Sequence, residues 1–154
     1  MAAEIERKFL VVEPPPLPAR GGDRIRQGYV ALDGATEVRI RRGHRGATLT
    51  VKTGSGLART EVEVPLDEQP AGELWELTGG RRVEKTRHRI SLPDGLTAEL
   101  DVYEGALAGL RTVEVEFVDE AAAGRFVAPA WFGEELTGHE GWSNAALALH
   151  GLPR

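Results

Sequence analysis

Apolar and charged residues alternate along most of this chain, and this period of two constrains the fold more than any other feature. The first segment would have two unlike faces, one with Ile5, Arg7, Phe9 and Val11 and the other with Glu4, Glu6 and Lys8. Similar segments recur at 24–32, 37–42, 47–53, 59–66, 81–92, 97–103 and 111–118. Because successive side chains of a β-strand point to opposite faces, the pattern predicts roughly eight strands.

The joints between these segments are short. Stretches 31–35, 42–46, 53–57 and 92–96 contain the Gly and Asp residues that tight hairpin turns require, and none is long enough for a helical crossover. The strands should therefore pair antiparallel. Short helices are expected at 67–78, 119–127 and 143–150, the last with Ser143 or Asn144 as its N-cap. A loop rich in proline, with Pro14, Pro15, Pro16 and Pro18, should separate the first two strands.

Composition excludes several classes of function. The chain has no cysteine, which removes disulfides, thiolate metal sites and cysteine nucleophiles. Its 19 basic and 24 acidic residues give a net charge of −5, so a broad basic surface for nucleic acid is not indicated. No run approaches the roughly 20 apolar residues of a membrane helix, and the first residues do not form a signal sequence. We expect one domain over residues 1–154, in the cytoplasm, with neither nucleic acid nor membrane as a partner.

The charged faces are ordered in blocks of one sign. Acids occur at i, i+2 spacing as Glu4 and Glu6, Glu61 and Glu63, Glu99 and Asp101, and Glu114 and Glu116. Bases occur in the same way as Arg24 and Arg26, Arg39 and Arg41, and Lys85 and Arg87, with Lys52 alone on another segment. Two such side chains lie about 6.6 Å apart along one face of a strand. If the strands close into a barrel with these faces inward, carboxylates and cations line one cavity with room for a small ligand.

This mixture of residue types suits a polyanion together with metal ions. Carboxylate oxygens are the ligands that hard cations such as Mg²⁺ or Mn²⁺ prefer. The planar fork of arginine matches phosphate oxygens, and lysine supplies a compact positive charge. Phosphoryl transfer is catalysed mainly by positioning and charge neutralisation, so no side-chain nucleophile is required.

Charged faces on antiparallel strands have a second explanation. They are usually solvated outer faces with cross-strand ion pairs, and alternation does not decide which face lies inside. A solvated face would more often include Ser, Thr and Gln, and the chain offers only short helices to cover its apolar faces. Periodicity by itself supports no more than a β-rich domain.

A series of short motifs resembles the CYTH superfamily, also called triphosphate tunnel metalloenzymes. The hallmark E-x-E-x-K of that family corresponds to Glu4, Glu6 and Lys8. The similarity continues in order through RQGYV at 26–30, EVRIR at 37–41, LTVK at 49–52, RTEVEV at 59–64, RRVEKTR at 81–87, ELDVYEG at 99–105, VEVEF at 113–117 and PAWFGEELT at 129–137. The similarity covers nearly the whole chain, and the chain looks most like the compact bacterial inorganic triphosphatases.

The resemblance implies an eight-stranded antiparallel tunnel with its charged faces inward and Mg²⁺ or Mn²⁺ as cofactor. By that likeness the metal ligands would be Glu4, Glu6, Asp101, Glu114 and Glu116, with Glu61 and Glu63 near a second metal or its waters. The phosphates would be bound by Arg39, Arg41, Lys52, Lys85 and Arg87, with help from Arg26. Lys8 would contact the substrate, and Lys8 and Tyr29 would lie near the attacking water.

The last segment differs from the family pattern. Members often have a Tyr and a Lys around the final helix, whereas this chain has Trp142 and Ala145 there and keeps Asn144. The missing cation would either change which end group of the substrate is tolerated or leave one tunnel mouth open. We assign no substrate role to this helix. The four histidines are dispersed without metal-binding spacing, so no imidazole metal site is expected.

The leading functional hypothesis is metal-dependent hydrolysis of inorganic triphosphate by a monomer or homodimer. A class IV adenylate cyclase would use the same metals on ATP but needs an adenine pocket, and a thiamine triphosphatase would leave the organic group outside the tunnel. From a different class, a polyphosphate-binding module without catalysis would bind triphosphate and not turn it over. Such a binder has less need for carboxylates beside a polyanion.

Overall fold

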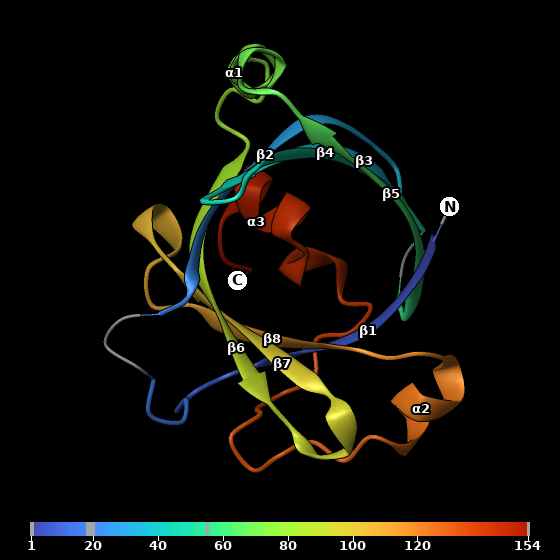
Figure 1. Ribbon diagram of the computed structural model, residues 1–154. Coiled ribbons are helices and arrows are strands. Elements are labelled where there is room, and N and C mark those ends of the chain that lie inside the picture. Colours follow the sequence, from blue (N-terminus) through green and yellow to red (C-terminus); the bar gives the residue numbers. More distant parts are fainter. Residues whose placement is uncertain (1, 18–20, 55, 154) are drawn as a thin grey trace.

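The computed structural model describes residues 2–17, 21–54 and 56–153, and its strands close into a barrel (Figure 1). Eight strands form it, namely β1 (Ala2–Leu10), β2 (Asp23–Asp33), β3 (Thr36–Gly43), β4 (Gly46–Thr53), β5 (Ala58–Leu66), β6 (Arg82–Ser91), β7 (Thr97–Tyr103) and β8 (Arg111–Glu116). Their order around the barrel is β1-β5-β4-β3-β2-β6-β7-β8, and every neighbouring pair is antiparallel. The predicted antiparallel barrel is confirmed.

Turn and cap residues account for where the elements begin and end. Gly34 lies in the tight turn between β2 and β3 and has a φ of 59°. A two-residue hairpin requires such a positive φ, which glycine adopts readily. Pro14 to Pro16 lie outside any strand, whereas Pro18 of the predicted loop and Ser55 of the β4–β5 turn fall outside the described residues.

The three α-helices occupy different positions relative to the barrel. α1 (Glu68–Glu76) contacts β2, β3 and β4 from outside, and α2 (Glu120–Arg125) lies outside near β1. α3 (Asn144–His150) lies within the ring of strands (Figure 1), where it contacts β6 and β2. The Ser143 side chain accepts a hydrogen bond from the amide of Ala146, which confirms Ser143 as the N-cap. None of the helices in the described ranges is long and apolar enough to cross a membrane.

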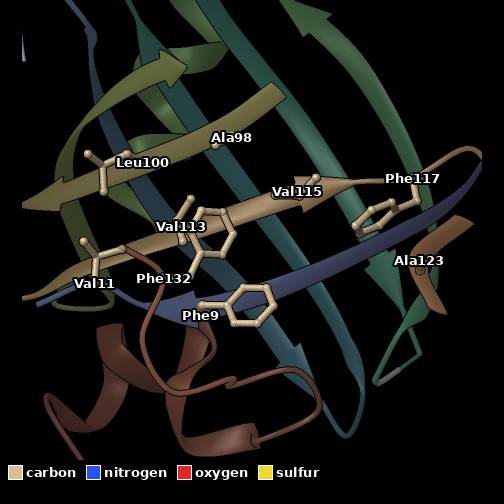
Figure 2. Packing of buried hydrophobic residues seen from close by; sticks show 9 residues of the cluster. All are labelled: Phe9, Val11, Ala98, Leu100, Val113, Val115, Phe117, Ala123 and Phe132. Atoms are coloured by element: carbon tan, nitrogen blue, oxygen red, sulfur yellow. The ribbon is translucent and has the colours of Figure 1, made fainter. Parts of the chain in front are cut away.

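The main hydrophobic core lies outside the barrel wall, against β1, β7 and β8 (Figure 2). Odd-numbered residues of β1, such as Phe9, point into it, and the segment after β8 covers it with Phe126 and Phe132. The rings of Phe9 and Phe132 are tilted with centroids 5.0 Å apart, a favourable aromatic geometry. Because apolar side chains are buried on the outer face of these strands, the inner face is left for charged groups.

The second half of β1 has a neighbour other than β5. β5 pairs with β1 only as far as Ile5, and beyond that point residues 133–137 lie alongside the strand. The amide of Leu136 donates to the carbonyl of Lys8 at 2.7 Å, and the amide of Leu10 donates to the carbonyl of Glu134 at 2.8 Å. This added segment completes the wall and leads through η3 (Glu140–Trp142) to α3.

Candidate active site in the barrel lumen

The barrel encloses a cavity of about 1150 Å³, and most of the predicted site residues line it. These are Glu4, Glu6, Lys8, Arg39, Arg41, Lys52, Glu61, Glu63, Arg87, Glu114 and Glu116. The charged faces of β1, β3, β4, β5 and β8 therefore point inward. The solvated-face explanation is wrong for these strands.

Charge is segregated across this lumen. Neighbouring strands β8, β1 and β5 form an acidic wall, which consists of Glu4, Glu6, Glu61, Glu63, Glu114 and Glu116. Strands β4, β3 and β6 form a basic wall, which consists of Lys52, Arg39, Arg41 and Arg87. The division is not complete, because Glu37 lies on β3 and the cations Lys8 and Arg59 lie on β1 and β5. The basic wall is suited to phosphate oxygens and the acidic wall to hard cations.

The acidic wall crowds like charges into one space. Burial and the neighbouring carboxylates of Glu114 and Glu4 raise the pKa of Glu6 well above its ordinary value. Burial opposes ionisation of Glu114 too, but Lys8, followed by more distant cations, lowers the pKa of that carboxyl overall. Burial and Glu4 also raise the pKa values of Glu61 and Glu116. A divalent cation bound to these carboxylate oxygens would relieve the repulsion between them.

No three Asp, Glu or His side chains of the described ranges are already gathered in a metal-binding arrangement. Part of the acidic wall is instead paired with a cation. The Lys52 ammonium lies 2.8 Å from Glu4 Oε2 and 3.9 Å from Glu61 Oε2. Although burial opposes ionisation, the charge of Lys52 lowers the pKa of the Glu4 carboxyl. Lys52 thus joins the two walls.

The basic wall holds guanidinium groups close to one another. Arg41 donates from Nε to the Gln27 side-chain oxygen at 2.9 Å. Burial, together with Arg39 and Arg87, lowers the pKa of Arg41 to about 10. Arg39 is buried, with Nη1 3.8 Å from Glu37 Oε1. A bound polyanion would relieve this mutual repulsion.

Lys8 and Tyr29, the residues predicted near the attacking water, have different partners. The Lys8 ammonium donates to the carbonyl of Trp142 at 2.7 Å and lies 4.0 Å from Glu114 Oε1. Tyr29 is fully buried, and its hydroxyl accepts a hydrogen bond from Gln27 at 2.6 Å. Burial raises the pKa of this phenol, which favours its protonated form.

The predicted site residues Arg26 and Asp101 do not line the cavity. Arg26 points outward, with Nε 3.4 Å from Glu84 Oε1 and its guanidinium over the Trp75 ring. Arg26 therefore lies outside the lumen in which the phosphate contact was predicted, because alternation along β2 places Gln27 and Tyr29, not Arg24 and Arg26, on the inner face.

Asp101 faces inward but is completely buried. Its two oxygens accept from Arg87 Nε and Nη2 at 2.8 and 2.9 Å, and Lys85 Nζ lies 2.7 Å from Oδ2. The oxygens of Asp101 are thus occupied by protein cations, and its role as a metal ligand stays a prediction. Lys85 is equally buried, behind the surface of the lumen.

The comparison with known proteins agrees with this geometry. The model of the CYTH domain matches residues 2–142. The chain belongs to the CYTH domain family. It is 46% identical over 147 residues to an inorganic triphosphatase of Nitrosomonas europaea, covering 95% of this chain and 97% of that protein.

Two further relatives extend the comparison. An inorganic triphosphatase of Acetivibrio thermocellus is 36% identical over 149 residues, covering 96% of this chain and 94% of that protein. The crystal structure of an inorganic triphosphatase superimposes with a TM-score of 0.72 at 42% identity and covers 99% of each chain. The resemblance predicted from the sequence is confirmed.

The CYTH lumen contains charged residues that sequence reasoning missed. Arg59 on β5 lines the cavity, with Nη2 3.6 Å from Glu37 Oε2. Within the described structure, the buried Nε groups of Arg59 and Arg39 have no hydrogen-bond partner. An anionic ligand would supply such a partner. Both Arg59 and Glu37 belong to i, i+2 charged series, RTEVEV and EVRIR, and this spacing could have identified them.

α3 gives this CYTH lumen one apolar side. Ala145, Ala146 and Leu149 line the cavity. The helix is held at its start by Asn144, whose side-chain oxygen accepts from the Tyr103 hydroxyl at 2.5 Å, and by the Lys8 contact to Trp142. Family members often have a Tyr and a Lys around this helix, whereas this chain has Trp142 and Ala145. The helix beside the charged walls of the lumen therefore contains no lysine.

Proposed function

We propose that this CYTH protein hydrolyses inorganic triphosphate in the barrel lumen with Mg²⁺ or Mn²⁺ as cofactor. The observation that carries the proposal is the segregation of charge, with the acidic wall opposite the basic wall inside one closed barrel. The naming of two relatives as inorganic triphosphatases, over nearly the full length of both chains, supports the choice of substrate.

In this proposal the basic wall binds the phosphoryl chain. Arg39, Arg41 and Arg87 donate to its oxygens, and Lys52 provides a compact charge at the junction of the two walls. These donors are fixed before the substrate arrives, so little reorganisation accompanies the build-up of charge in the transition state.

The acidic wall holds the metal in this proposal. Glu4, Glu6, Glu114 and Glu116 are the proposed ligands, and Glu61 and Glu63 lie on the adjacent strand near a second metal or its waters. When bound, a divalent metal supplies charge neutralisation and lowers the pKa of a water. Lys8, which lies 4.0 Å from Glu114, is placed beside the attacking water in this proposal. Tyr29 is placed near the same water and is connected to Arg41 through the side chain of Gln27.

Phosphate release tests the proposal. Triphosphate, ATP, thiamine triphosphate and pyrophosphate are compared with Mg²⁺, with Mn²⁺ and with EDTA. Triphosphate turnover should require metal, and Glu4→Gln or Lys52→Ala should lower kcat/KM at least about 100-fold, the scale of losing one preorganised charged group. Glu120→Gln, an exposed carboxylate on α2, is the matched control and should leave turnover unchanged.

Other outcomes would identify other functions. Formation of cyclic AMP from ATP would indicate an adenylate cyclase, and preferential turnover of thiamine triphosphate would indicate a thiamine triphosphatase. Triphosphate binding without turnover, in a folded protein supplied with either metal, would replace the proposal with a polyphosphate-binding module.

A further inference from the structure

Two charged side chains without exposed surface form a cluster with Arg87 of the basic wall. Asp101 on β7 and Lys85 on β6 are both 0% exposed, and Arg87 is 6% exposed. Arg87 and Asp101 are directly opposite each other in the β6–β7 register. The cluster therefore belongs to two adjacent strands, and only Arg87 of the three lines the cavity.

The geometry of the cluster fixes how Arg87 meets the lumen. Asp101 accepts from Nε at 2.8 Å and from Nη2 at 2.9 Å, which is a bidentate pairing of one edge of the guanidinium. Nη1 is left on the opposite side and lies 3.3 Å from Glu99 Oε2, a partly exposed carboxylate that lines the cavity. A planar group held along one edge presents its remaining N–H groups in a single direction.

Asp101 also compensates the charge of Lys85. Removing one member of a buried ionic cluster is costly because the others are left without a counter-charge. Lys85 Nζ lies 2.7 Å from Asp101 and 5.6 Å from the centre of the Tyr103 ring. Asp101 on β7 and the more distant Glu114 on β8 favour the charged form, and Arg87 on β6 and Arg41 on β3 oppose it. Burial is the largest influence and lowers the pKa of Lys85 to about 7.

We propose that Asp101 is a positioning residue for triphosphate, which aims Arg87 into the lumen and keeps the ammonium of Lys85 beside it. The inference rests on the proposed function for its ligand. Asp101 itself touches neither substrate nor metal. It acts through the two cations of β6, and the acidic wall supplies all the metal ligands.

Metal-free binding of triphosphate tests this role. Calorimetry in EDTA at pH 6.5 compares the wild type, Asp101→Asn and Glu99→Gln, the last being a matched loss of one carboxylate on the same face of β7. Asp101→Asn should weaken triphosphate binding at least tenfold. Glu99→Gln should not weaken it, because Glu99 competes with phosphate for Arg87 Nη1.

The metal requirement separates positioning from ligation. In Asp101→Asn, the Mg²⁺ concentration that half-saturates hydrolysis should stay as in the wild type, whereas Glu114→Gln should raise it. An Asp101→Asn variant that binds triphosphate normally in EDTA but needs more Mg²⁺ would overturn the proposal and make Asp101 a metal ligand. If the asparagine variant does not fold, Asp101→Glu keeps the charge but displaces Arg87, and the same two measurements apply.

A readout without substrate separates this inference from the proposed function. The side-chain NMR signal of Lys85, identified by its loss in Lys85→Met, should titrate near pH 7 in the wild type and at least about one unit lower in Asp101→Asn. An unchanged titration would refute the role of Asp101. A wild type that shows the titration but does not bind triphosphate would refute the proposed substrate, and only the part of the inference in which Asp101 holds Arg87 and Lys85 in place would stand.

Discussion

At the scale of single residues, the uncharged Gln27 connects groups that the proposed chemistry needs. Its oxygen accepts from Arg41 Nε at 2.9 Å, and its nitrogen donates to the Tyr29 hydroxyl at 2.6 Å. Gln27 is completely buried and contributes no charge to the lumen. An amide suits this position because it supplies an acceptor to one neighbour and a donor to the other.

Gln27→Leu removes both contacts while nearly preserving volume. The Arg41 Nε and the Tyr29 hydroxyl would remain buried without a partner, so the free energy of unfolding should fall by about 1–3 kcal/mol in urea titrations. KM for triphosphate should rise because Arg41 is no longer oriented. Gln69→Leu, at an exposed position of α1, is the matched control and should change neither quantity. An unchanged KM in Gln27→Leu would show that Arg41 needs no such support.

Residue-scale prediction from sequence succeeded where alternation alone decides the outcome. On β1, β3 and β8 the charges at i, i+2 spacing share one face, and that face is the lumen, whereas Arg7 of β1 points outward. Prediction did not give the outward direction of Arg26, because β2 carries charges on its outer face, and no pattern within one strand shows this. It did not give the partners of Asp101, because spacing gives the direction of a side chain and these partners come from β6.

At the scale of elements, the segment 133–137 links the outer core to the lumen. On the outside, Arg7 donates from Nε and Nη2 to the two oxygens of Glu135 at 2.8 and 2.7 Å. On the backbone, the amide of Gly133 donates to the carbonyl of Leu10 at 2.6 Å. The position of α3 inside the barrel follows from this path and could not be predicted, because its apolar residues fit an outer helix equally well.

Gly133 tests whether this segment must lie close to β1. A Cβ at Gly133 would lie 2.9 Å from the carbonyl oxygen of Leu10, too close without a shift of the backbone. Gly133→Ala should therefore lower the free energy of unfolding by about 1–3 kcal/mol and reduce triphosphate turnover, since the segment positions α3 and Lys8.

Gly124→Ala in α2 is the matched control, because a Cβ there meets no atom within 4 Å. In a helix this substitution should stabilise by roughly 0.5–1 kcal/mol. Thermal unfolding followed by circular dichroism compares the two alanines. Equal melting temperatures would mean that the segment can move away from β1 without cost.

At the scale of the whole molecule, the main apolar core lies outside the barrel wall, and the paired charges of β1, β3, β5 and β8 lie inside it. Strand number and antiparallel pairing could be predicted from alternation and short joints. The inward direction of the charged faces could not, because a strand with two different faces fits either orientation. The outer position of the core is visible only once β1, β7 and β8 are seen to share Phe9, Leu100 and Val113 (Figure 2).

This arrangement predicts how ligands change the stability of the whole protein. Without ligand, the acidic wall and the basic wall each hold like charges close together, as the raised pKa of Glu6 and the lowered pKa of Arg41 indicate. If triphosphate binds the folded barrel as proposed and not the unfolded chain, it should stabilise by about 2.7 kcal/mol at a hundredfold excess over Kd. For a chain of this size the melting temperature should rise by about 5–10 °C.

Differential scanning calorimetry in EDTA measures this rise and separates specific binding from ionic screening. KCl at the same ionic strength should give a much smaller shift, because ions weaken charge interactions without bridging the donors of the basic wall. Lys52→Ala should lose most of the triphosphate shift and keep the KCl response, since Lys52 is buried where the two walls meet. If KCl and triphosphate raised the melting temperature equally, the lumen would respond to ionic strength alone, and the basic wall would not be a triphosphate site.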